Sequence, residues 1–185
     1  MASLDPSNGL DLLPIRGDDH VKGPPDAPVT LVEFGDYECP GCAEAYVTIQ
    51  RIHDELQDRL RFVYRHYAYA RIHPHAELAG QAAEAAGAQG KFWEMHDFLF
   101  GDQGHLELQD LVSRAKRLDL DLQTFKEDLK SERYLDRVRD DFKTGVQNGV
   151  FGTPALFING VRHNAAPDYE TLMQALEQPL VESPR

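Results

Sequence analysis

The 185-residue sequence predicts an α/β fold in which a βαβ unit is followed by a run of helices and then by a ββα unit. Residues 29–34 (VTLVEF) are an apolar segment rich in β-forming residues, and residues 61–67 (RFVYRHY) predict a second strand. A helical pattern lies between them. Because a strand–helix–strand crossover makes its two strands parallel, we expect these segments to run in the same direction. Residues 155–158 (ALFI) precede an Asn-Gly hairpin turn and a return strand at 161–162.

The elements at the start of the chain follow from local composition. Residues 1–25 are polar and contain four prolines, so we expect an extended arm rather than a core element. The strand at 29–34 is expected to be buried at the centre of the sheet, since one carboxylate alone interrupts its apolar residues. The helix after it starts near Cys39. Its apolar side chains recur every three or four residues, at Tyr46, Ile49, Ile52 and Leu56.

The chain between residues 72 and 147 carries helical patterns, and we predict that it forms a helical insertion. The helices expected within it cover residues 74–88, 91–100, 106–120, 122–130 and 132–147. Residues 168–176 predict a closing amphipathic helix. Because no flexible linker separates the parts, residues 26–71 and 148–180 are predicted to form one domain around the insertion.

The charge balance argues against several classes of partner. The chain has 19 basic and 31 acidic side chains and a net charge of -12, which repels nucleic acids and anionic membrane surfaces. No apolar stretch is long enough for membrane insertion. Residues 1–20 lack the features of a signal peptide, so we expect a cytoplasmic location for the chain as written, and an extracytoplasmic one if a leader has been removed.

The two cysteines of the sequence, Cys39 and Cys42, are spaced C-x-x-C at the expected junction between a buried strand and a helix. A helix N-terminus carries partial positive charge, which stabilises a thiolate and lowers the pKa of Cys39. Pro40 suits the first helical turn. Cys42, nearly one turn later, is expected to face Cys39 and to be better shielded. Cys39 would therefore attack a substrate sulfur, and Cys42 would resolve the mixed disulfide.

Glu33 is the carboxylate that interrupts the predicted central strand. Burial would raise the pKa of Glu33 toward neutrality, so that the carboxyl could exchange a proton with Cys42. The alternative is that Glu33 points to an exposed end of the sheet and has no role.

Gly152-Thr153-Pro154 stands just before the predicted strand at 155–158. Proline has no backbone N–H, so Pro154 leaves neighbouring backbone groups free to pair with an extended substrate chain. A simple strand-initiating proline is the alternative.

Several other residues have a structural and a functional interpretation. Phe92, Trp93, Phe98 and Phe100 are expected in the core, with a substrate groove as the alternative. His73 and His75 are expected to be exposed or to cap a helix, unless one of them lies near the cysteines. Half of a zinc site is the alternative for the cysteines. Because no second C-x-x-C and no suitably spaced histidine pair accompanies them, we predict neither a metal nor a bound cofactor.

Three segments together resemble the DsbA-like thioredoxin-fold oxidoreductases: VTLVEFGDYECPGC, HPHAELAGQAAEAAGAQGKFWEMHDFLF and GTPALFING. The resemblance covers about residues 18–178 and implies a thioredoxin-like core split by a helical insertion. It also implies roles for five residues. Cys39 would be the nucleophile, Cys42 the resolving thiol and Glu33 the buried acid. Pro154 would be a cis-proline facing the disulfide, and the backbone of Thr153 would receive the substrate peptide.

The active-site dipeptide departs from that of the best-known periplasmic oxidants of this family. Those proteins carry Pro-His where this sequence has Pro40-Gly41, and Gly41 supplies no side chain to stabilise a thiolate, which argues against a strongly oxidising potential. Similar domains also occur appended to sodium/proton antiporters.

The sequence therefore predicts a thiol-disulfide oxidoreductase that exchanges disulfides with protein substrates and is recycled by a redox partner. Oxidase, reductase and isomerase directions remain open. The alternatives are a redox-sensing or zinc-holding module without turnover, and a glutathione-using enzyme of the same superfamily.

Overall fold

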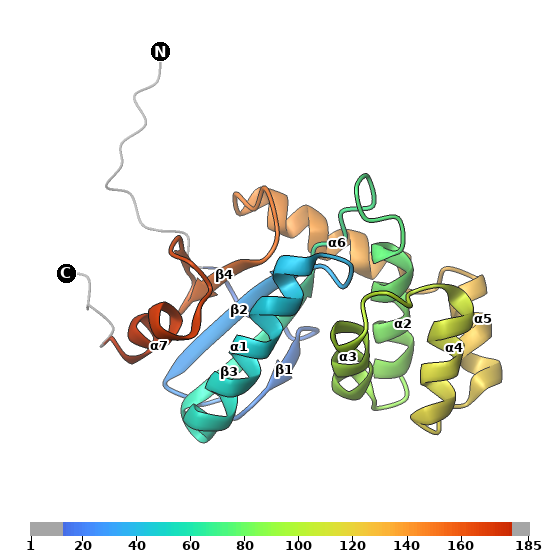
Figure 1. Ribbon diagram of the computed structural model, residues 1–185, viewed down its shortest axis with the longest axis horizontal. Coiled ribbons are helices and arrows are strands. Elements are labelled where there is room, and N and C mark those ends of the chain that lie inside the picture. The colour runs from blue at the N-terminus through green and yellow to red at the C-terminus, as the bar shows by residue number, and fades with distance from the viewer. Residues whose placement is uncertain (1–12, 179–185) are drawn as a thin grey trace, which may run out of the picture.

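The computed structural model describes residues 13–178, which form a five-stranded sheet with helices on both faces (Figure 1). The strand order is β1 (His20–Lys22), β3 (Leu60–His66), β2 (Val29–Gly35), β4 (Ala155–Ile158) and β5 (Val161–His163). Strands β2 and β3 are parallel, and the other neighbours are antiparallel. Strand β2 is central because its apolar residues are buried on both faces of the sheet.

Side chains of β2 alternate between two separate hydrophobic clusters. Leu31 packs in the larger cluster with α1 (Pro40–Leu56) and α7 (Tyr169–Glu177), two helices that contact each other. Val32 and Phe34 belong to the cluster on the opposite face. Since successive residues of a strand point to opposite faces, Glu33 lies on the same face as Leu31, the face covered by α1.

Five helices lie between β3 and β4 in the chain and gather beside one end of the sheet (Figure 1). They are α2 (Ala76–Gly87), α3 (Phe92–Gly101), α4 (Leu108–Arg117), α5 (Leu122–Lys130) and α6 (Leu135–Gln147). Helix α2 contacts each of the other four, because its many alanines leave room for close packing. Helix α6 also reaches β3 and leads the chain back to the sheet.

The predicted fold class is confirmed, and from β2 onward the elements follow the predicted order. The predicted strand at 155–158 coincides with β4, whereas helix ends shift by a few residues. The helix expected from Pro74 begins at Ala76, because residues 73–75 form turns that place two histidine side chains against other groups.

The prediction that residues 1–25 form an extended arm was wrong for the part that the structure describes, and residues 1–12 lie outside it. Strand β1 pairs with β3, and Leu13 is buried. The fully buried guanidinium of Arg65 donates hydrogen bonds to the Asp19 carboxylate at 2.6 and 2.8 Å and to the Pro14 carbonyl oxygen at 2.6 Å. The segment from residue 13 onward is therefore part of the core, held by a buried ion pair.

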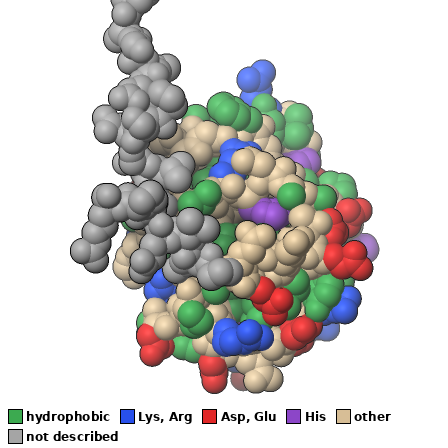
Figure 2. Space-filling model, turned by 90° about the vertical axis from the view of Figure 1, so that its left-hand side faces the viewer, with side chains coloured by type: hydrophobic (Ala, Val, Ile, Leu, Met, Phe, Trp, Pro, Cys, Tyr) green, Lys and Arg blue, Asp and Glu red, His purple; other side chains and the backbone are tan. Residues whose placement is uncertain are grey.

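None of the helices within residues 13–178 combines the length and the apolar character needed to cross a bilayer. On the face shown in Figure 2, acidic, basic and hydrophobic side chains are interspersed.

Candidate active site at the C-x-x-C helix

Cys39 is the N-cap residue of α1, with extended backbone angles (φ -80°, ψ 120°) and Pro40 in the first turn. Strand β2 ends at Gly35, and the Cys39 N–H donates to the Asp36 carbonyl oxygen across the short connection. The N–H groups of Cys42 and Ala43 point back to the Cys39 carbonyl oxygen at 3.1 and 3.3 Å. The strand-to-helix junction thus places the Cys39 sulfur at the positive end of the helix, as the sequence predicted.

The Cys39 thiol ionises readily in this position, with its pKa lowered to about 5. The main cause is the thiol of Cys42, which donates a hydrogen bond to the thiolate. Burial opposes this effect, while Thr153 and the N–H groups of Cys42 and Gly41 reinforce it. In its protonated form the Cys39 sulfur instead donates to the Thr153 carbonyl oxygen at 3.5 Å.

Cys42 has the opposite character, although it is only three residues away. Its side chain is fully buried, and its sulfur accepts a hydrogen bond from the Asp36 N–H at 3.4 Å. Burial raises the pKa of Cys42 far above that of an ordinary thiol, and the hydrogen bond with Cys39 and the nearby charge of Glu33 raise it further. Both cysteines are free thiols. The site therefore holds one thiolate and one protonated thiol at neutral pH.

Glu33 lies under the cysteines on the α1 face of the sheet and is 1% exposed. Its Oε1 atom has no hydrogen-bond partner among the described residues. Burial, and next the charge of Cys39, raise the pKa of Glu33 to about 8. The alternative that Glu33 points to an exposed end of the sheet is therefore wrong. The carboxyl is close enough to influence both thiols, and it changes protonation near neutral pH.

The loop before β4 faces the cysteines from the other side. The peptide bond between Thr153 and Pro154 is cis. A Cβ atom added to Gly41 would lie 3.3 Å from Pro154 Cδ and 3.8 Å from the Cys39 sulfur. The missing side chain at Gly41 thus lets the proline ring pack closely against the dipeptide between the two cysteines. The structure brings together all the residues that the sequence singled out for the site.

His73 and His75 lie beside the site, on the loop between β3 and α2. His73 Nδ1 is 2.8 Å from Asp36 Oδ2, and His75 Nδ1 is 2.9 Å from Glu38 Oε1. Asp36 and Glu38 belong to the connection that leads into Cys39. His75 is the N-cap residue of α2 and its side chain is 41% exposed, as expected, and both histidines also contact the residues just before the nucleophile.

Sequence reasoning missed Gln103. Its amide Nε2 donates to the carbonyl oxygens of Tyr37 and Cys39 at 3.0 and 2.8 Å. Gln103 lies in the turn after α3, far from the cysteines in sequence, and nothing in its local pattern indicates this contact. It fixes the backbone of the nucleophile from the side of the helical insertion.

The aromatic residues of α3 are mainly core residues. Phe92 and Phe100 are buried in the larger cluster, and Trp93 packs against it and donates from Nε1 to the Val21 carbonyl oxygen. Phe98 is half-buried, with the Arg117 guanidinium 4.4 Å from its ring centre. For Phe92 and Phe100 the structure thus supports the interpretation as core residues over a substrate groove.

Curated proteins similar to this chain are much longer than it. The Na(+)/H(+) antiporter NhaA 1 of Salinispora arenicola is 44% identical over 178 residues, which are 95% of this chain and 27% of the antiporter. The antiporter NhaA of Herminiimonas arsenicoxydans is 40% identical over 159 residues, 86% of this chain and 25% of that protein. The chain spans about a quarter of the length of these relatives.

Solved structures similar to this chain include thiol-disulfide oxidoreductases. Oxidised BdbD from Bacillus subtilis matches with a TM-score of 0.77 and 27% identity, over 85% of this chain and 90% of BdbD. A thioredoxin-like oxidoreductase from Silicibacter pomeroyi matches with a TM-score of 0.77 and 26% identity, over 88% of this chain and 92% of that one. The alpha-DsbA1 protein of Wolbachia pipientis, at 18% identity, shares the fold with a TM-score of 0.77 over 90% of this chain and 92% of its own.

A family model described as Thioredoxin (Thioredoxin_4) matches residues 16–178, almost all of the chain. This range includes the sheet, the helical insertion, both cysteines and Pro154. The chain therefore belongs to this thioredoxin family, and its fold is that of the DsbA-like oxidoreductases.

Proposed function

We propose that this chain catalyses thiol-disulfide exchange with protein substrates through Cys39 and Cys42. The observation that carries the proposal is the opposite ionisation of the two thiols. The pKa of Cys39 is lowered to about 5, whereas burial raises that of Cys42. A thiolate that is formed at neutral pH attacks sulfur, and a shielded neighbour stays protonated until it is needed.

The reduced protein acts in two balanced steps. In the first, the Cys39 thiolate attacks one sulfur of a substrate disulfide; a bond forms between Cys39 and that sulfur, the substrate disulfide breaks, and the other substrate sulfur leaves as a thiolate. In the second, Cys42 loses its proton to the carboxylate of Glu33 and attacks the Cys39 sulfur. The second substrate sulfur leaves as a thiolate, and Cys39 and Cys42 become a disulfide. The two substrate thiolates take up one proton from Glu33 and one from solvent, which gives the dithiol. The same steps in reverse oxidise a substrate dithiol.

The loop at Thr153 and Pro154 is the proposed binding site for the substrate peptide. The Thr153 carbonyl oxygen is 3.5 Å from the Cys39 sulfur, so a peptide that pairs with this backbone brings its own sulfur to the nucleophile. Two residues earlier, Phe151 leaves 85% of its surface exposed, so an apolar side chain is available to a substrate beside this loop. A separate redox protein then restores the starting state of the cysteine pair.

Trapping distinguishes this function from its alternatives. Cys42→Ser, mixed with disulfide-containing protein substrates, should accumulate mixed disulfides through Cys39 that reducing agent releases, as seen by non-reducing electrophoresis and mass spectrometry. Cys39→Ser is the matched control and should trap nothing. Adducts with glutathione alone would favour a glutathione-using enzyme. Bound zinc that is lost with either cysteine, together with the absence of adducts, would favour the zinc-holding module and refute the proposal.

A further inference from the structure

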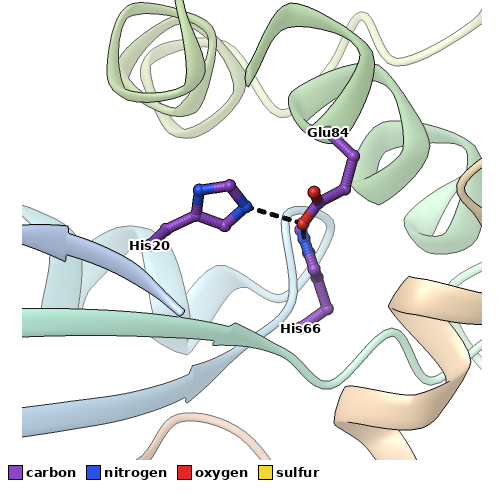
Figure 3. A group of neighbouring side chains, drawn as sticks. All are labelled: His20, His66 and Glu84. Carbon is purple, nitrogen blue, oxygen red and sulfur yellow. Dashed lines mark hydrogen bonds and ion pairs between the residues drawn. The ribbon is translucent and has the colours of Figure 1, made fainter. Parts of the chain in front are cut away.

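Three metal-binding side chains meet away from the cysteines, at the junction between the sheet and the helical insertion. His20 comes from β1, His66 from the end of β3, and Glu84 from α2 (Figure 3). The two Nε2 atoms are each 2.8 Å from the same carboxylate oxygen, Glu84 Oε1. One ligand atom from each residue lies within 4.8 Å of the others.

The group is largely enclosed, and His20 is its most exposed member. The side chains of His66 and Glu84 are 2% and 9% exposed, whereas that of His20 is 20% exposed. The ring of His20 also stacks on Phe92, with 3.4 Å between the ring centres, which fixes its orientation. His20 is therefore the ligand residue that solvent reaches most, and the other two residues are already held in place.

The local charge does not oppose a cation. Arg137 is the positive group beside the site, with Nε 3.8 Å from Glu84 Oε1. The guanidinium of Arg137 is also bound by the carboxylates of Asp18 and Asp141, at 2.9 and 3.0 Å. Arg16 also contacts Asp18, Asp19 and Asp141, and Arg65 binds Asp19. Three guanidinium groups thus face four carboxylates, so the network carries an excess of negative charge that Glu84 can offer to a metal ion.

We propose that His20, His66 and Glu84 form a binding site for a divalent transition-metal ion, with Zn²⁺ as the best match. Two imidazole nitrogens and one carboxylate oxygen are a zinc ligand set that leaves the fourth position to water. Imidazole ligands disfavour Ca²⁺ and Mg²⁺, which prefer oxygen. In the metal-free protein each Nε2 carries a proton toward Glu84. On binding, the ion replaces these protons, which move to Nδ1 or to solvent.

Such an ion would tie three separate elements together. The ligands are far apart in the chain, with a sequence separation of 64 between His20 and Glu84 and of 18 between His66 and Glu84. A bound ion would fasten β1 and the edge of the sheet to the helical insertion. The loop that follows His66 carries His73, which contacts Asp36 beside the cysteines. The site is thus placed to stabilise the side of the fold that supports the active site.

The test is a titration of the full chain with Zn²⁺ alone, followed by calorimetry, in the Cys39→Ser/Cys42→Ser background so that the thiols cannot bind the metal. We expect one ion per chain, and cobalt-bound protein should show the visible absorption of Co²⁺ with nitrogen and oxygen ligands. His20→Gln should weaken the binding by at least about tenfold. His105→Gln, which changes an exposed histidine paired with Asp102, should not.

A second pair of variants guards against loss of folding. Glu84→Gln removes the central ligand, and Glu77→Gln on the same helix removes a carboxylate that pairs with Arg139 instead. Far-ultraviolet circular dichroism reports whether each variant is folded, and the partly exposed His20 provides the test that least disturbs the core. Absence of saturable one-to-one binding in the double-serine protein, or equal binding after His20→Gln, would overturn the proposal. Neither result would contradict the proposed thiol-disulfide exchange, because that reaction needs no metal.

Discussion

Replacing Cys42 with alanine removes the interaction that contributes most to the low pKa of Cys39. A hydrogen bond to a charged group contributes about 1.5–3 kcal/mol, and a difference of about 1.4 kcal/mol corresponds to one pH unit. The pKa of Cys39, about 5 in the native protein, should therefore rise by about 1–2 pH units. Part of the shift remains in the variant, because the helix N–H groups and Thr153 still favour the thiolate.

The assay is the ultraviolet absorbance of the thiolate, measured during a pH titration of the reduced protein. Only Cys39 contributes near neutral pH in the native protein, since burial raises the pKa of Cys42. With a pKa of about 5, the Cys39 thiol is roughly 99% ionised at neutral pH, and a rise of about 1–2 pH units leaves it about 90% to about 50% ionised. The difference between the proteins is therefore largest on the acidic side of neutrality, and a full titration measures it better than a single reading at neutral pH.

Cys42→Ser is the matched control, because a hydroxyl can still donate a hydrogen bond to the thiolate. Its midpoint should lie between those of the native protein and the alanine variant. The reasoning is refuted if the native thiol titrates like free cysteine, or if the alanine variant and the native protein share one midpoint.

Three further predictions concern stability, measured by urea unfolding of the reduced protein. The pKa of Glu33 is raised from 4.5 to about 8, so the folding free energy that its protonated carboxyl contributes is fully present below pH 4.5 and is lost as the pH rises toward 8. The native protein should therefore lose stability relative to Glu33→Gln, by up to about 4 kcal/mol between about pH 5 and about pH 8. The same variant should also exchange disulfides more slowly, in a stopped-flow assay, if Glu33 accepts the proton of Cys42. Ile52→Ala should cost about 2–5 kcal/mol, since the side chain is fully buried between α1 and the sheet. Gly145→Ala should cost about 1–3 kcal/mol, because the added Cβ would lie 2.7 Å from a ring carbon of Tyr67.

Two of the stability predictions have a matched control in the chain. Glu44→Gln changes an exposed carboxylate of α1, and its effect should not vary with pH as that of Glu33→Gln does. Gly101→Ala adds a Cβ atom that meets nothing within 4 Å, so it should be tolerated where Gly145→Ala is not. A pH-independent effect of Glu33→Gln would contradict a carboxyl that titrates near neutrality. Equal effects of the two alanine substitutions would contradict the packing argument.

The parts of the fold that could be predicted are those with a local signal. Strand β2 is an apolar run, β4 is bounded by Pro154 and an Asn-Gly turn, and the C-x-x-C spacing marks a helix start. Each of these patterns depends on residues that are close to one another in the sequence. The position of Cys39 at the N-terminus of α1 follows directly from these local patterns, so the central part of the site could be predicted from the sequence.

The rest depends on contacts between residues distant in sequence. Strand β1 has three residues, too few for an alternating pattern to be recognised, and its place in the sheet is set by pairing with β3. Gln103 reaches the Cys39 backbone only because the insertion packs beside α1. His20, His66 and Glu84 have no metal-ligand spacing, since three different elements supply them.

The buried ion pair of Arg65 has a practical consequence for anyone who shortens this protein. A cut at residue 26, the domain boundary suggested by the composition, would remove Asp19 and the Pro14 carbonyl and leave a guanidinium enclosed without its partners. Loss of one partner of such a pair typically costs about 3–5 kcal/mol, which is a large share of the stability of a small domain. An expression fragment should therefore retain the chain from Leu13 onward, even though most of that stretch reads as a tail.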